Sequence, residues 1–218
     1  YPAWKTNRNQ FLLTVEMLLV LSGISIFACF VHREGSLFIV AICGLLVASL
    51  AISYAVYRTG AVYRLFGLAA YNKVTIAYLC AGLVVGLVAA TGYRHYYDSF
   101  LLPGTLTAIA LISPLIGMTE ELVFRGYLQG RSQLYGPYFS IFIAAAGHTL
   151  YKYLVLKSMV VYTVIDFPLL VLFTFLFGLI IGAIRHLSQN IVPALAAHAL
   201  FDILVYGDYA EMPVWVWG

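Results

Sequence analysis

The chain has 218 residues, of which 63% are apolar and only 10% are charged. A soluble domain of this length needs a far more charged surface, so the composition excludes an ordinary soluble protein and favours one that is solvated by lipid. The formal net charge of +3 is small and scattered, which argues against a surface for nucleic acid. No polar linker divides the chain, so we expect a single compact unit.

Seven stretches are apolar and long enough for a helix to cross the bilayer core, which takes roughly 20 residues. We therefore predict an all-α fold, a polytopic transmembrane helix bundle of about seven spans. Residues 58–73 mix basic and aromatic side chains, and 207–218 form an aromatic tail, so both are predicted to lie at the membrane interface. The predicted spans are 12–31, 37–57, 74–92, 105–129, 138–156, 160–184 and 189–206.

The basic residues of the predicted turns gather on one side of the membrane, whereas on the other side Arg33 and Arg94 stand beside acidic residues. The positive-inside rule then places the N-terminus in the cytoplasm and the C-terminus outside. The basic residues of the first side are Lys5, Arg8, Arg58, Arg64, Lys73, Arg131 and Arg185, and Lys152 and Lys157 are exceptions to the pattern.

Two adjacent carboxylates, Glu120 and Glu121, stand within the fourth predicted span. Burying an ionisable group in a bilayer costs roughly 2.5–3.5 kcal/mol on insertion scales, so such groups usually have a functional or pairing role. Glu121 and Arg125 are four residues apart and share a helix face, which predicts an ion pair. Glu120 points about 100° away and has no local partner, which suits proton transfer. The alternative is a buried ion network that only fixes helix packing.

Three more ionisable residues lie within later predicted spans. His148 follows a run of small residues in span five, where a packing role is the alternative to catalysis. His198 and Asp202 are four residues apart in span seven and share a face, where a local hydrogen bond between them is the alternative. If the three helices bring these groups to one point, a carboxylate and a histidine can activate water while a second polar pair stabilises an oxyanion. The residues therefore indicate hydrolysis within the membrane.

The order Glu-Glu-x-x-x-Arg, a mid-helix His, and His-x-x-x-Asp resembles the CPBP family of CAAX-processing and bacteriocin-processing membrane endopeptidases, also called Abi proteins. The similarity covers roughly 105–206, the expected catalytic core, which leaves 1–104 as a variable N-terminal part and 207–218 as a tail. The chain departs from the family's second motif at Ala144, where the family has Phe. It has Asp202 where the third motif often has Asn.

The resemblance implies a glutamic-type intramembrane protease that acts on a membrane-embedded or lipid-anchored peptide. In it Glu120 activates water together with His148, Glu121 and Arg125 form a supporting pair, and His198 and Asp202 stabilise the oxyanion. No cofactor is implied.

Two other functions remain open. A zinc peptidase is the nearer one, since Glu and two His residues can bind zinc, although the chain has no His-Glu-x-x-His helix. The other is a non-catalytic scaffold or accessory subunit within a larger membrane protein complex. The three cysteines, Cys29, Cys43 and Cys80, lack metal spacing and are interpreted as small buried hydrophobes.

Overall fold

A computed structural model describes residues 7–60, 62–68, 73–97, 99–159 and 166–211. Within these ranges all regular structure is helical, apart from one isolated bridge between Leu68 and Asn190. The predicted all-α bundle is therefore confirmed. The helices are α1 Asn7–Phe30, α2 Ser36–Thr59, α3 Val62–Phe66, α4 Lys73–Tyr96, α5 Ile109–Glu121, the π-helix η1 Leu122–Leu128, α6 Gln129–Ser132, the 3-10 turn η2 Gln133–Tyr135, α7 Pro137–Ser158, α8 Phe167–Ser188 and α9 Val192–Tyr206.

Five helices of the described chain are long and apolar enough to cross a membrane, which makes this an integral membrane protein. Helix α9 has 15 residues, about 22 Å at 1.5 Å per residue, which is short of a hydrocarbon core of about 30 Å. The predicted span 105–129 is observed as the run α5–η1–α6, whose apolar sequence is interrupted by Glu120, Glu121 and Arg125. The count of seven spans therefore stays a prediction. The five helices are Gln10–Phe30, Ser36–Thr59, Lys73–Tyr96, Pro137–Ser158 and Phe167–Ser188.

Several helix ends follow from local sequence. Pro137, Pro168 and Pro193 each lie in the first turn of their helix, where the missing N–H costs nothing. Asp166 caps α8 by accepting a hydrogen bond from the Leu169 N–H at 3.0 Å. The sixth predicted span therefore begins later than expected, and its first residues, 160–165, lie outside the described residues. Lys5 and the aromatic segment 212–217 also lie outside them.

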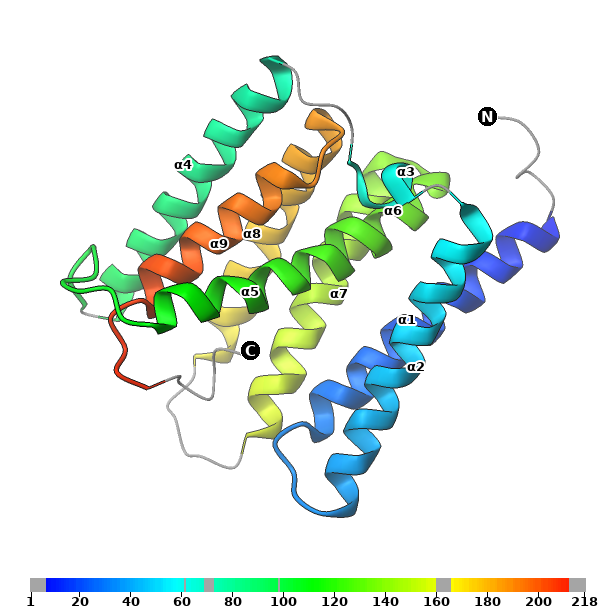
Figure 1. Cartoon of the computed structure of the whole chain (residues 1–218), viewed down its shortest axis with the longest axis horizontal. Helices are drawn as coiled ribbons and strands as arrows, with labels where there is room; N and C mark the ends of the chain where they lie inside the picture. Colours follow the sequence, from blue (N-terminus) through cyan, green and yellow to red (C-terminus); the bar gives the residue numbers. More distant parts are fainter. Residues whose placement is uncertain (1–6, 61, 69–72, 98, 160–165, 212–218) are drawn as a thin grey trace.

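Two groups of helices flank the central helices α5 and α7 (Figure 1). The α1–α2 hairpin packs against α7 on one side, while α4 packs on α9 on the other, and α9 in turn lies against α5. Gly82 and Gly86 of α4 meet the backbone carbonyls of Pro193 and Ala197, and a Cβ at either glycine would overlap them. Small residues thus let these two helices approach closely, as is usual in membrane bundles.

A buried carboxylate that the sequence analysis did not single out lies at one end of the bundle. Glu16 of α1 is 5% exposed and accepts hydrogen bonds from Arg131 Nε at 2.7 Å and from Tyr127 Oη at 2.9 Å. Arg58 Nη2 lies 3.1 Å from its other oxygen. Two basic residues that were expected in turns therefore pair with a carboxylate, so this cluster ties α1, α2 and α6 together.

Two other expected turn residues belong to longer helices than predicted. Helix α4 continues to Tyr96, so Arg94 is buried, where it pairs with Asp208 at 2.8 Å. Helix α8 continues to Ser188, and Arg185 is buried with Nη2 3.3 Å from the Leu65 carbonyl oxygen. The bundle thus supplies hydrogen-bond acceptors for both guanidinium groups, although Arg185 Nε has none in the described structure.

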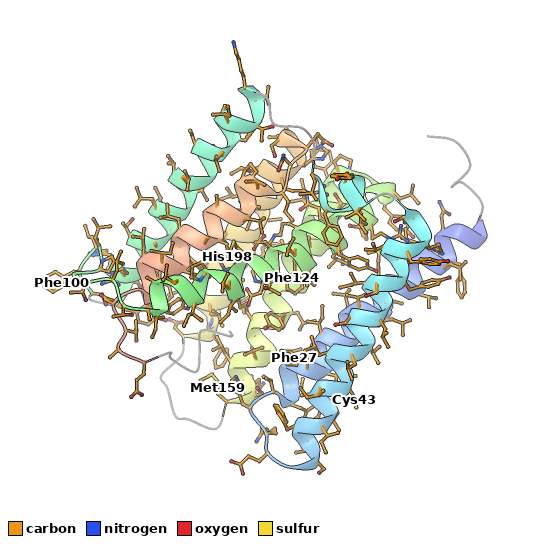
Figure 2. All side chains as sticks on the ribbon, viewed as in Figure 1. Phe27, Cys43, Phe100, Phe124, Met159 and His198 are labelled. Carbon is orange, nitrogen blue, oxygen red and sulfur yellow. The ribbon has the colours of Figure 1, made fainter. Side chains whose placement is uncertain are left out.

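The cysteine interpretation is wrong for two of the three residues. Cys43 and Cys80 are exposed on the outside of the bundle, and Cys29 is partly buried. Figure 2 shows Cys43 on the outer side of α2. In a membrane protein an apolar environment includes the lipid-facing surface, so an apolar run does not by itself predict burial.

Candidate active site

Three segments carry the predicted site residues to the middle of the bundle. Glu120 and Glu121 end α5, Arg125 follows in η1, His148 lies midway along α7, and His198 and Asp202 lie on α9. All six side chains are at most 6% exposed. Figure 2 shows His198 and Phe124 toward the centre of the bundle, whereas Phe100 lies at its edge.

Glu120 is the hub of the first half of the site. Its Oε2 lies 3.0 Å from His148 Nε2, and Lys152 Nζ lies 2.9 Å from its Oε1. His198 Nε2 is 3.9 Å from Oε2, too far for a direct hydrogen bond. The carboxylate that lacked a partner on its own helix therefore has partners on α7.

Glu121 is the hub of the second half. The predicted pair with Arg125 is present, with Nη1 3.0 Å from Glu121 Oε1, and both side chains are fully buried. The same Oε1 lies 2.8 Å from His198 Nδ1. Arg125 Nη1 also lies 2.7 Å from His148 Nδ1. The pair thus touches both histidines rather than only bracing its own helix.

These contacts determine which nitrogen of each histidine carries a proton. A guanidinium only donates, so His148 Nδ1 must accept from Arg125, which leaves His148 neutral with its proton on Nε2. That proton is donated to Glu120. A carboxylate only accepts, so His198 Nδ1 donates to Glu121. The unbound Nε2 of His198 then faces Glu120.

Asp202 lies beside His198 without a hydrogen bond to it. The distance from His198 Nε2 to Asp202 Oδ1 is 3.8 Å, so the local hydrogen bond considered from the i,i+4 spacing does not form. The Asp202 carboxylate rests on Gly117 of α5, where a Cβ would overlap its Oδ2 and lie 2.7 Å from His198 Cδ2. Glycine at this position therefore makes room for both side chains.

Aromatic packing holds the first histidine in place. The Phe124 ring stacks on His148 with centroids 4.8 Å apart, and the two histidine rings are 5.8 Å apart. Stacking on one face restricts rotation of the imidazole ring about its side-chain torsions. The His148 ring is therefore constrained by Arg125 at one edge, by Glu120 at the other and by Phe124 on its face.

A cavity of about 930 Å³ opens beside the two histidines, between α4, α7, α8 and α9. The lining includes the site residues His148, Lys152, His198 and Asp202. Several aromatic side chains and the Arg94–Asp208 pair also line it. Glu120 touches two of the lining residues, so a molecule in the cavity reaches the carboxylate past His148 and Lys152. The aromatic lining residues include Tyr93, Phe173, Phe177, Phe201 and Tyr206.

Lys152 is the site residue that the sequence analysis missed. It is 8% exposed, and it follows His148 by four residues, which puts both on one face of α7. Its charge was noted only as an exception to the distribution of basic residues among the turns. The combination of that exception with the i,i+4 spacing from His148 is the signal that would have found it.

The site residues do not suit a zinc ion as they are arranged. Across the part of the chain that the structure describes, no three His, Cys, Asp or Glu side chains are grouped to hold a metal. Both nitrogens of His148 are engaged, one by Arg125 and one by Glu120. The cationic groups of Arg125 and Lys152 lie where they would repel a second cation.

The comparison with family models agrees with the residues that form this site. Residues 100–204 match the Rce1-like family model, described as type II CAAX prenyl endopeptidase Rce1-like. This match supports the assignment of residues 100–204 to the CPBP family. The match contains the six predicted site residues and Lys152, and it supports the family predicted from the three motifs. No curated protein and no solved structure matches the chain. The predicted boundaries of the N-terminal part and of the tail stay predictions.

The match to an endopeptidase family supports protease activity in general, and it suggests a CAAX-type activity within a membrane. It assigns neither a substrate nor the chemical role of any side chain. Those roles have to be argued from the contacts of Glu120, the two histidines and the cavity.

Proposed function

We propose that the chain is an intramembrane endopeptidase that hydrolyses a peptide bond of a membrane-embedded or lipid-anchored protein or peptide. The observation that carries this proposal is the buried Glu120 carboxylate, held by His148 and Lys152 beside the cavity. A carboxylate without an arginine partner, next to a space large enough for a peptide, can take a proton from water.

In the proposed reaction a water oxygen attacks the peptide carbonyl carbon while Glu120 takes a proton from that water. His148 donates to Glu120 and so orients the carboxylate, because its other nitrogen accepts from Arg125. The new oxygen–carbon bond forms a tetrahedral oxyanion. The carbon–nitrogen bond then breaks, and the proton held by Glu120 passes to the departing amine.

His198 is the proposed donor to the oxyanion. Its Nε2 is free of other hydrogen bonds in the described structure and faces the region beside Glu120. When protonated, this nitrogen can donate, and the carboxylate of Asp202 at 3.8 Å favours the protonated form. Asp202 itself accepts only, so its proposed role is to support His198 rather than to bind the oxyanion directly.

The proposal is tested by Glu120→Gln, which keeps the size of the side chain and removes the base. The purified variant and the wild type are given membrane-anchored peptides in liposomes, and cleavage is followed by mass spectrometry. We expect the variant to lose proteolysis while it unfolds at a temperature close to that of the wild type. Glu34→Gln is the matched control, because Glu34 is exposed in the turn after α1.

The same variant separates the protease from a scaffold. A scaffold or accessory subunit would keep its function in cells with Glu120→Gln, and only changes on surfaces that meet a partner would abolish it. Unaltered cellular function of Glu120→Gln would therefore overturn the catalytic role.

We further propose seven spans, with the N-terminus in the cytoplasm. Basic residues at the ends of the spanning helices and between them support this arrangement. Lys73 begins α4 and Arg131 lies in α6, on the side where α3 packs against α2 and α6. Arg33 stands beside Glu34 in the turn between α1 and α2, so the opposite side has less net positive charge.

A further inference from the structure

Lys152 is a buried cation whose position the established motifs of the site do not explain. Its ammonium lies 2.9 Å from the Glu120 carboxylate, and its side chain is 11% exposed. A buried ammonium is costly unless it is paired, and Glu120 is the carboxylate with which Lys152 pairs within the described residues. The pair joins α7 to α5 beside the cavity that Lys152 lines.

The other groups around Glu120 give it no fixed positive charge. On its own helix, Glu121 and Arg125 neutralise each other at 3.0 Å. On α7, His148 is neutral because Arg125 donates to its Nδ1, and the nearby phenol of Tyr151 is also neutral.

On α9, two titratable groups of opposite sign face Glu120, and their effects oppose each other. His198 lies 3.9 Å away and Asp202 lies beside His198, while the phenol of Tyr206 is neutral. Lys152 is therefore the permanent cation in direct contact with Glu120.

We propose that Lys152 is a positioning residue that keeps Glu120 ionised and holds its carboxylate toward the cavity. For catalysis this rests on the proposed role of Glu120 as the base, but the charge relation between the two side chains does not. The ammonium has two opposite effects on Glu120 as a base. It makes Glu120 available at lower pH, and it makes the same carboxylate a weaker base.

These two opposing effects change the pH dependence of activity, which a purely structural role of Lys152 would not do. Lys152→Gln keeps a hydrogen-bond donor and removes the charge, so Glu120 becomes protonated at a higher pH. Because an opposite charge in contact is worth about one to three pH units, the acid limb of the kcat/KM profile should move up by that amount. Activity should fall on the acid side of the profile, where Glu120 becomes protonated, and recover as the pH rises.

Two variants control for this experiment. Lys152→Arg keeps the charge and should keep the acid limb close to that of the wild type. Lys157→Gln removes an exposed lysine from the same helix, whose ammonium donates to Tyr153 Oη, and it should leave the profile unchanged. A loss of activity in Lys152→Gln that is equal at every pH would overturn the proposal, since misfolding has that effect.

A second measurement needs no substrate and distinguishes failure of this proposal from failure of the proposed function. An apolar carbodiimide modifies protonated carboxyl groups within membranes, and mass spectrometry locates the modification. We expect little modification of Glu120 in the wild type at neutral pH and several-fold more in Lys152→Gln. The double variant Glu120→Gln with Lys152→Gln identifies the signal, because Glu121 is adjacent.

The role of Lys152 and the protease function can therefore fail independently. Suppose that Glu120 is strongly modified in Lys152→Gln and that the wild type cleaves no peptide. This result would support the charge relation between the two side chains and count against the protease. Equal modification in the variant and the wild type would overturn the role of Lys152, whether or not the protein cleaves peptides.

Discussion

Removing the guanidinium of Arg125 should destabilise the whole bundle. The Arg125→Leu variant leaves Glu121 as a carboxylate that is fully buried, and breaking a buried pair in this way costs about 3–5 kcal/mol. A chain of this length loses roughly 2–4 °C in its unfolding midpoint per kcal/mol, so we expect a fall of about 6–20 °C. His148 also loses the donor to its Nδ1, which adds to the cost.

The assay is thermal unfolding of purified protein in a mild detergent. Arg33→Leu is the control, because Arg33 is exposed in a turn and its loss should change the midpoint by little. An Arg125→Leu protein that unfolds within about 2 °C of the wild type, well below the expected fall, would refute the reasoning.

A double variant tests the cause of the loss. Arg125 Nε and Nη2 have no hydrogen-bond partner in the described structure, so burying the guanidinium is itself costly. Glu121→Gln combined with Arg125→Leu removes both charges and leaves an amide oxygen to accept from His198 Nδ1. Because neutral groups replace an ion pair, most of the lost stability should return.

Two further predictions concern the site and the topology. Gly117→Ala places a Cβ against Asp202 and His198, so we expect proteolysis to fall at least tenfold and stability by about 1–3 kcal/mol, measured by peptide cleavage and thermal unfolding. Gly104→Ala, whose Cβ would meet nothing within 4 Å, should behave as the wild type. In a chain whose three cysteines are replaced, Ala210→Cys should react with an impermeant thiol reagent added outside intact cells. Reaction only after the cells are opened would refute the proposed orientation.

The sequence predicts the bundle well because hydropathy and helix length are local properties. It also predicts the Glu121–Arg125 pair, since both residues belong to one helix and their spacing decides the contact. The helix ends are harder to predict. Arg94 looks like a turn residue until α9 supplies the Leu204 carbonyl and Asp208 as its acceptors.

The parts of the site that the sequence could not give depend on contacts between helices. Nothing in the chain shows that His148 accepts from Arg125, or that His198 donates to Glu121, because each contact joins two different helices. The π-helix that follows Glu121 is equally invisible, since its residues also suit an α-helix. Lys152 was overlooked because its charge was weighed against the turns rather than against the buried carboxylates.

The close packing of α4 on α9 has a consequence for how the protein is made. Arg94 Nη1 donates to the Leu204 carbonyl oxygen at 2.9 Å, and these residues are 110 positions apart in the chain. At about 5–20 residues per second, a ribosome needs roughly 5–20 s to reach the second after the first. During that interval the guanidinium must be solvated by water or lipid headgroups, and Gly82 and Gly86 face no helix that fits them. Helix α4 therefore enters the membrane well before α9 exists, so the cavity between them forms only after α9 has been made.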